Sequence, residues 1–110
     1  MTFKEYDDFV KTTAIYPEDK KVIYPAFGLS GEVGEIMEKL KKIMRGGGDV
    51  QNMDNNNKEE LKKEIGDVLW YLSAISRDLG FELEDVANRN LEKLSSRKDR
   101  GVIQGEGDNR

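Results

Sequence analysis

The chain has 110 residues with a formal net charge of −4 at pH 7, and 36% of its residues are charged, the same share as its hydrophobic residues. It contains no histidine and no cysteine, which excludes Ser-His-Asp and Cys-His nucleophilic sites, thiolate or imidazole zinc sites, and disulfides. Any metal ion that it binds must therefore be a hard cation held by oxygen ligands.

The acidic balance, with a pI near 5.0, argues against binding of duplex nucleic acid, which requires a basic face to neutralise phosphates. No segment approaches the roughly 20 apolar residues of a membrane span, and the first residues lack the apolar stretch of a signal peptide. We therefore expect a cytoplasmic protein with no membrane partner. Because the apolar fraction is small for a monomer of this length, we also expect a homo-oligomer.

Apolar residues recur at helical intervals in four segments. Thr2 and Glu5 have the spacing of a capping box, and they begin a first short helix that extends to about Ala14. A long amphipathic helix is predicted from Gly28 to about Met44, where three consecutive glycines end it.

The following stretch, rich in Asn and Asp up to Asn57, is predicted to be a loop. A second long helix covers Leu61 to Leu79, and a last helix carries the apolar residues from Leu83 to Leu94. The sequence thus predicts an all-α fold, a bundle of about four helices. We expect a single domain over residues 1–100 and a glycine-rich C-terminal tail over residues 101–110.

The two long helices repeat one pattern, in which an acid is followed by an apolar residue, a glycine and a second acid. Because each helical residue advances about 100°, the two acids of each helix lie at about 300° and 240°, beside the apolar stripe. If both stripes pack into one core, four carboxylates meet along its edge. They are Glu32, Glu35, Glu64 and Asp67.

Four carboxylates in one place repel one another, so they need a counter-ion or protons. Oxygen-only ligands on facing helices describe a magnesium site better than any other metal site. Gly34 and Gly66, between the acids, leave room for an approach to the helix backbone. A di-iron carboxylate bundle is excluded, because its Glu-x-x-His ligation needs two histidines.

The pairs Glu32-x-x-Glu35 and Glu64-x-x-Asp67 on successive helices resemble the signature of the MazG-type, all-α nucleoside triphosphate pyrophosphohydrolases. The resemblance covers most of the chain. Further similar features are Gly28-Leu29, Leu40-Lys41-Lys42, Asp67-x-x-x-Tyr71-Leu72, Asn90-x-x-Lys93 and the C-terminal tail, which is similar to the ends of some short single-domain members.

This resemblance implies magnesium-dependent hydrolysis of a nucleoside triphosphate at the α-β phosphate bond, giving a monophosphate and pyrophosphate, with Mn²⁺ as a substitute cation. The implied metal ligands are Glu32, Glu35, Glu64 and Asp67. Either Glu32 or Glu35 would accept the proton of the attacking water. The oligomers typical of the family imply a homodimer or a homotetramer.

For the phosphate chain of the substrate the first candidate is Lys39, which lies on the acid face one turn beyond Glu35. Further candidates for substrate binding are Lys42, Lys93 and Arg97 for the phosphates, and Tyr71 and Asn90 for the base or sugar. Plainer interpretations stay open. Lys39 also has the spacing of an i, i+4 ion pair with Glu35, Tyr71 suits the edge of a core, and the basic residues of the last helix suit a solvated face.

Two other functions stay open from the sequence, a non-catalytic helical interaction module and a nucleotide-binding regulator.

Trp70 lies at about 180° on its helix, opposite the apolar stripe, and we expect it in a subunit interface.

The tail carries two apolar residues, Val102 and Ile103, that we expect to anchor it. Such an anchor would place Lys98, Arg100 or Arg110 near the acids.

Overall fold

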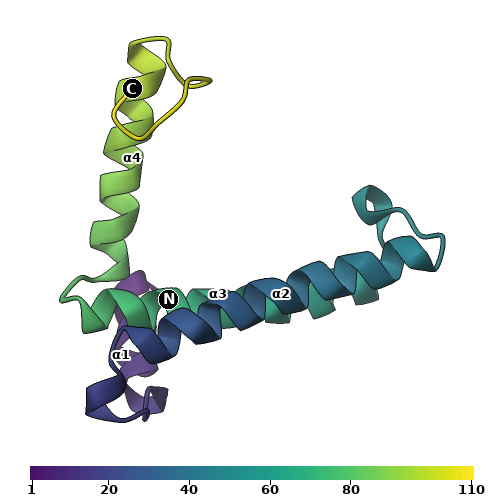
Figure 1. Cartoon of the computed structure of the whole chain (residues 1–110), viewed down its shortest axis with the longest axis horizontal. Coiled ribbons are helices and arrows are strands. Elements are labelled where there is room, and N and C mark those ends of the chain that lie inside the picture. Colours follow the sequence, from purple (N-terminus) through teal and green to yellow (C-terminus); the bar gives the residue numbers. More distant parts are fainter.

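The computed structural model describes all 110 residues and contains four α-helices and no strand, which confirms the all-α prediction. The α-helices are α1 (Phe3–Thr13), α2 (Ile23–Arg45), α3 (Asn55–Asp78) and α4 (Leu83–Asp99), with 3₁₀ turns η1 (Glu18–Lys20) and η2 (Val50–Asn52) in the first two connections. The long helices α2 and α3 run side by side in opposite directions, and α1 lies across them near the end of α3 (Figure 1).

Helix α1 begins as predicted, because the backbone N–H of Glu5 donates to the hydroxyl oxygen of Thr2 at 3.1 Å. Its Asp7 carboxylate then ties three helices together. One oxygen accepts from the hydroxyl of Ser73 on α3 at 2.6 Å, and the other accepts from the backbone N–H of Leu83 at 3.0 Å. The second bond satisfies an unpaired N–H at the start of α4, so Asp7 fixes where α4 leaves the other helices.

Helix α2 begins at Ile23, five residues before the predicted Gly28. Pro25 is tolerated there because the N–H groups of the first helical turn have no intrahelical partner. The turn into the helix is fixed from outside by the buried Asp78 of α3. Its Oδ2 accepts from the backbone N–H of Val22 at 2.9 Å and from the hydroxyl of Tyr16 at 2.6 Å.

Helix α3 also begins earlier than predicted, at Asn55, inside the Asn-rich stretch that was expected to be a loop. Asp54 is the cause, since its carboxylate accepts from the backbone N–H of Asn57 at 2.8 Å. An N-cap of this kind stabilises a helix by about 1 kcal/mol, which offsets part of the low helix propensity of three asparagines.

Trp70 is half-buried within the chain, because its indole N–H donates to the hydroxyl of Thr13 on α1 at 2.7 Å. On the same side of α3, Ser73 and Ala74 are buried. The side of α3 that we expected to face another subunit is therefore covered in part by α1 of the same chain, and the subunit interface stays a prediction. A helical wheel identifies a face but does not identify what packs on it.

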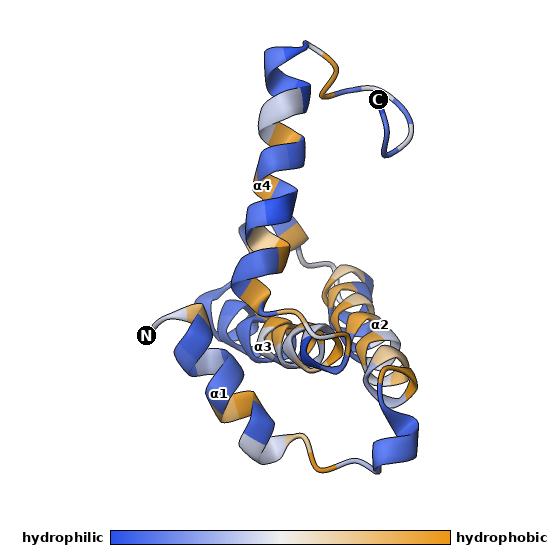
Figure 2. Ribbon diagram, turned by 90° about the vertical axis from the view of Figure 1, so that its left-hand side faces the viewer, coloured by the Kyte–Doolittle hydropathy of each residue, from blue (hydrophilic) through white to orange (hydrophobic).

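Helix α4 stands nearly perpendicular to the α2–α3 pair and touches the other helices only near its start (Figures 1 and 2). The radius of gyration is consequently 17.0 Å, against about 13 Å for a compact domain of this length. The accessible surface is 8241 Å², against about 6,200 Å² for a compact monomer of this mass. A single copy thus leaves about 2,000 Å² more surface in water than a compact fold would.

The core is correspondingly small, since only seven of the 110 residues are buried. Large apolar side chains remain exposed on all four helices, and they include Phe9 of α1, Phe27 and Met37 of α2, Ile65 of α3 and Leu91 of α4. None of the helices combines the length and the apolar composition that crossing a bilayer requires.

Residues 101–110 fold back onto the far end of α4, away from the other helices (Figure 1). The expectation that Arg100 or Arg110 approaches the acids is therefore corrected for a single chain. The guanidinium of Arg100 instead donates to the carbonyl of Arg110 at 2.6 Å, and that of Arg110 donates to the carbonyl of Val102 at 3.0 Å.

Candidate functional site

Three of the four paired acids converge where α2 and α3 pack together. Glu32 of α2 and Glu64 and Asp67 of α3 each place a carboxylate oxygen so that the three oxygens lie within 4.8 Å of one another. The repeated pattern placed Glu32 and Glu64 at the same angle on their helices and Asp67 about 60° away, and the antiparallel pairing brings the three side chains together. We call Glu32, Glu64 and Asp67 the acid cluster.

Glu35 stands outside the acid cluster and is exposed on the same helix, one turn beyond Glu32. The charge of Glu35 still affects the pKa of Glu32 in the acid cluster. Burial and the nearby charges of Asp67, Glu64 and Glu35 together raise the pKa of Glu32 above its usual value. Proximity of like charges disfavours ionisation, so the acid cluster favours a cation.

Lys39 supplies one cation, and its partner differs from the one suggested by the spacing along α2. Its Nζ lies 3.1 Å from Oε1 of Glu64 and 3.5 Å from Oε2 of Glu60, both on α3. No ion pair forms between Lys39 and Glu35. The bond to Glu64 raises the pKa of Lys39, which keeps the ammonium charged beside the acid cluster.

Tyr71 lies half-buried at the edge of the acid cluster. Burial raises its pKa most, followed by the charges of Glu32, Tyr24 and Asp67. Its ring packs so closely on Gly28 of α2 that a side chain at that position would overlap the phenol. Tyr71 thus packs at the core edge, as the plainer interpretation predicts, and it also borders the acids; its contact with a base or sugar stays a prediction.

Sequence reasoning did not single out Tyr6, which reaches the same region from α1. Burial raises the pKa of Tyr6, and the charges of Asp67 and Asp7 raise it further. Its helical spacing from Phe3 and Phe9 marked it only as an apolar position. Nothing in that pattern could show that α1 would pack beside Asp67.

The two glycines between the paired acids have open space around them. A methyl group built at Gly34 or at Gly66 would meet no atom within 4 Å. The helices of one chain therefore do not need these glycines in order to pack, and the backbone beside the acids is accessible from outside.

The remaining candidates fall into two separate groups. Lys42 lies with Lys39 and Glu60 on a cavity of about 450 Å³, toward the connected ends of α2 and α3. Asn90 and Lys93 line a different cavity, of about 630 Å³, on α4. Figure 1 shows α4 pointing away from α2 and α3, so a single chain does not bring the α4 candidates to the acid cluster.

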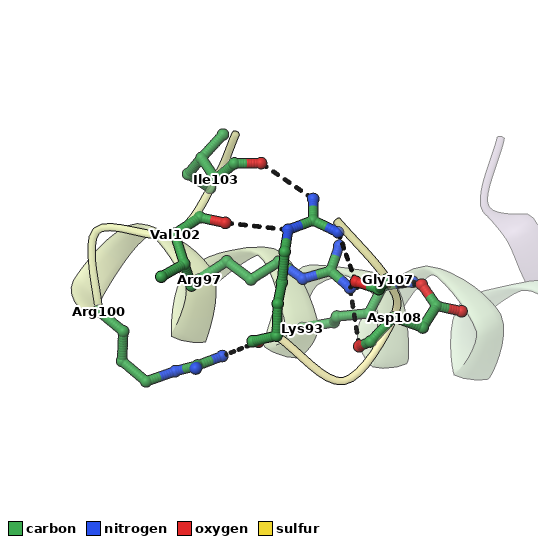
Figure 3. A network of polar contacts seen from close by, with 8 residues as sticks. Lys93, Arg97, Arg100, Val102, Ile103, Gly107 and Asp108 are labelled. Atoms are coloured by element: carbon green, nitrogen blue, oxygen red, sulfur yellow. Dashed lines mark hydrogen bonds and ion pairs between the residues drawn. The ribbon is translucent and has the colours of Figure 1, made fainter. Parts of the chain in front are cut away.

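Arg97 is the exception among the basic candidates, because it is buried, with 5% of its surface exposed. It lies one turn beyond Lys93 on α4, under the folded tail (Figure 3). Its surroundings contradict the interpretation of the last helix as a solvated basic face at this position.

Comparison with known proteins gives one family and one close relative. Residues 26–102 match the family described as MazG nucleotide pyrophosphohydrolase domain, a range that includes all four paired acids. The chain is 45% identical over 111 residues to "Gene 37 protein" of Mycobacterium phage L5, and the alignment covers 96% of each chain. No solved structure matches the chain.

Proposed function

Because this chain belongs to the MazG nucleotide pyrophosphohydrolase family, we propose that it hydrolyses a nucleoside triphosphate between the α- and β-phosphates. The products would be a nucleoside monophosphate and pyrophosphate. The observation that carries the proposal is the convergence of three carboxylate oxygens from two helices within 4.8 Å of one another.

The donor set of the acid cluster fits a hard divalent cation, Mg²⁺ by preference and Mn²⁺ as a substitute, since every ligand is a carboxylate oxygen. Glu32, Glu64 and Asp67 would hold it. Such a cation supplies charge neutralisation at phosphate oxygens and lowers the pKa of water.

We assign to Glu35 the role of accepting the proton of the attacking water. Glu35 is the second acid of the α2 pair but lies outside the acid cluster, so its oxygens remain free when the other three residues hold a cation. It is also exposed, and a water molecule can reach it. Lys39, already beside Glu64, is positioned to contact a phosphate oxygen of the substrate.

The substrate site needs a second copy of the chain. Helix α4 exposes an apolar stripe with Val86 at 44%, Leu91 at 62% and Leu94 at 43% exposure, and it also carries the candidates Asn90 and Lys93. The excess surface of about 2,000 Å² is more than twice the roughly 800 Å² that each partner buries in a standard interface. We therefore propose a homodimer or homotetramer in which α4 of one copy covers an apolar face of another.

The test incubates the full-length protein with a panel of ribo- and deoxyribonucleoside triphosphates and Mg²⁺, and separates the products by ion-exchange chromatography. We expect monophosphate and pyrophosphate in equal amounts from at least one substrate, and neither product in chelator. Glu64→Gln should abolish the reaction. Glu38→Gln, which removes the same charge from a side chain paired with Lys41 at 3.0 Å, should retain it.

Other outcomes overturn the proposal in distinguishable ways. Orthophosphate with a nucleoside diphosphate would contradict attack at the α-phosphorus. Nucleotide binding without products would indicate a nucleotide-binding regulator. Absence of both nucleotide and Mg²⁺ binding would indicate a non-catalytic helical interaction module.

A further inference from the structure

The C-terminal tail, residues 101–110, forms a closed loop against the end of α4 (Figure 3). The guanidinium of Arg110 holds the loop by donating to three backbone carbonyls, those of Val102 at 3.0 Å, Ile103 at 2.9 Å and Gly107 at 2.6 Å. These bonds shape the loop, and they turn the residue that follows Gly107 back toward the helix.

That residue is Asp108, whose carboxylate sits between two cations of α4. Its Oδ1 lies 3.2 Å from Nζ of Lys93 and 3.3 Å from a guanidinium nitrogen of Arg97. The same guanidinium nitrogen donates to the backbone carbonyl of Asp108 at 2.8 Å. The hydrogen bonds to Lys93 and Arg97 lower the pKa of Asp108, so the carboxylate is ionised in this position.

Asp108 leaves part of the hydrogen-bonding capacity of Lys93 and Arg97 unused. Charge-assisted N–H···O⁻ bonds are commonly about 2.7–2.9 Å long, and both contacts of Oδ1 are longer. Only 5% of the surface of Arg97 is exposed, and its buried Nε has no hydrogen-bond partner. A buried guanidinium with an unused N–H is costly, so Arg97 keeps a donor available for an oxygen of a further acceptor.

Space for such an acceptor lies directly beside Asp108. The cavity of about 630 Å³ is lined by Asp108 and Lys93 together with the cation of Arg89 and the amide of Asn90, and Phe81 supplies an aromatic wall. This volume lies within the roughly 300–1,000 Å³ typical of sites for small ligands. Lys93 and Asp108 line the cavity, and Arg97, whose Nε is unpartnered, adjoins it through its contact with Asp108.

We propose that Lys93 and Arg97 form a phosphate-binding site that Asp108 of the same chain occupies, so that a phosphate-bearing ligand binds there by displacing the C-terminal tail. A phosphate group presents three terminal oxygens, whereas Asp108 contacts the two cations through Oδ1 alone, and phosphate carries more charge. The inference deepens the proposed function, because the phosphate chain of a nucleotide is the ligand expected in this family. Within one chain, however, the site is separate from the acid cluster.

The experiment uses the full-length protein in chelator, so that no hydrolysis occurs. Inorganic pyrophosphate is titrated by calorimetry, while the backbone amides of Gly105, Gly107 and Asp108 are followed by NMR. We expect saturable binding and a shift of these amides toward the values of an unstructured chain. A nucleoside triphosphate should produce the same shift, and the nucleoside without phosphate should produce none.

Two variants with the same change in net charge show whether Asp108 itself competes with pyrophosphate or whether the net charge of the tail sets the affinity. Asp108→Asn should bind pyrophosphate at least fivefold more tightly than the parent, because it removes the competing carboxylate. Glu106→Gln makes the same change in net charge, yet Glu106 forms no ion pair or side-chain hydrogen bond, so its affinity should stay within twofold of the parent. Lys93→Gln should weaken binding at least tenfold, and since Lys93 is 38% exposed it tests the site without removing the buried Arg97.

Three results would overturn the inference: no pyrophosphate binding, binding that leaves the tail amides unchanged, or equal affinities for Asp108→Asn and Glu106→Gln. None of them bears on the acid cluster, because the measurement involves neither metal nor turnover. Conversely, a protein that hydrolyses no nucleotide would still show the displacement of the tail, because phosphate binding at Lys93 and Arg97 requires no turnover.

Discussion

The ammonium group of Lys39 on α2 lies 3.1 Å from Oε1 of Glu64 on α3 and thereby places a positive charge on the acid cluster. The same lysine reaches Glu60 at 3.5 Å, one turn earlier on α3. In the absence of a bound cation this lysine is the counter-ion that the three carboxylates have.

The stability of the metal-free protein should therefore depend on Lys39. In chelator, Lys39→Gln should lower the thermal midpoint, because the acids then repel one another without a neutralising charge. With saturating Mg²⁺ the difference from the parent should shrink, because the metal stabilises the folded state that binds it. Lys41→Gln, whose partner is the exposed Glu38, is the matched control and should show no such dependence on metal. Equal effects of metal on the two variants would contradict the pairing of Lys39 with the cluster.

Glu32→Gln should separate activity from stability. The raised pKa of Glu32 means that the folded protein disfavours its ionised form, so at neutral pH the neutral glutamine should leave the metal-free protein as stable as the parent or more so. Activity should nonetheless fall by about 100-fold or more, as expected for loss of a metal ligand. Chemical denaturation in chelator and initial rates with Mg²⁺ measure the two effects. A variant that unfolds before the parent would show that Glu32 has a structural role.

Glu35→Gln should behave differently from Glu32→Gln in metal titrations. If Glu35 takes a proton and the acid cluster holds the cation, Glu35→Gln should lower kcat by about 100-fold or more while the Mg²⁺ affinity changes little. Calorimetric titration of Mg²⁺ into each variant gives the comparison. Equal losses of affinity in the two variants would make Glu35 a metal ligand and leave the proton acceptor among the other acids.

The exposed stripe of α4 should be needed for assembly. Leu91→Glu places a charge in the stripe and should shift sedimentation from the oligomer to the monomer, with loss of activity because the site is then incomplete. Ser96→Glu adds the same charge at an exposed position about 140° around α4 from Leu91 and should leave assembly intact. A parent protein that sediments as a stable monomer at micromolar concentration would refute the role of the stripe.

The bond from Tyr16 to Asp78 should give the protein a pH dependence at the alkaline end. Burial and the hydrogen bond to Asp78 raise the pKa of Tyr16 from 10.0 to about 12. Because the folded pKa lies above the unfolded one, this contribution to stability is fully present below pH 10 and is lost as the pH rises through about 12.

Tyr16→Phe isolates that contribution from the titration of the lysines. The variant should lose about 1–2 kcal/mol at pH 7, since it removes a hydrogen bond to a buried carboxylate. Between pH 10 and pH 12 it should lose less stability than the parent, so the two urea midpoints should approach each other. Parallel curves would show that the phenol does not titrate in contact with Asp78.

The sequence by itself determined that the chain forms four α-helices, and it identified the three residues of the acid cluster. A period of 3.6 residues fixes which side chains share a face, so the repeated acid pattern placed Glu32, Glu64 and Asp67 at one edge of the core before any packing was known. Capping chemistry is equally local, and it located the start of α1 at Thr2.

Only the tertiary structure decided what each face meets. Lys39 was equally suited to Glu35 on its own helix, and the neighbouring helix offered Glu64 instead. Tyr6 reached Asp67 because α1 folds across the long helices, which its own periodicity could not show. The direction of α4 depends on contacts such as that between Asp7 and Leu83, which lie 76 residues apart. Periodicity and capping act within a few residues of the chain. Contacts between residues far apart in the sequence depend on how whole helices pack, which a local pattern does not determine.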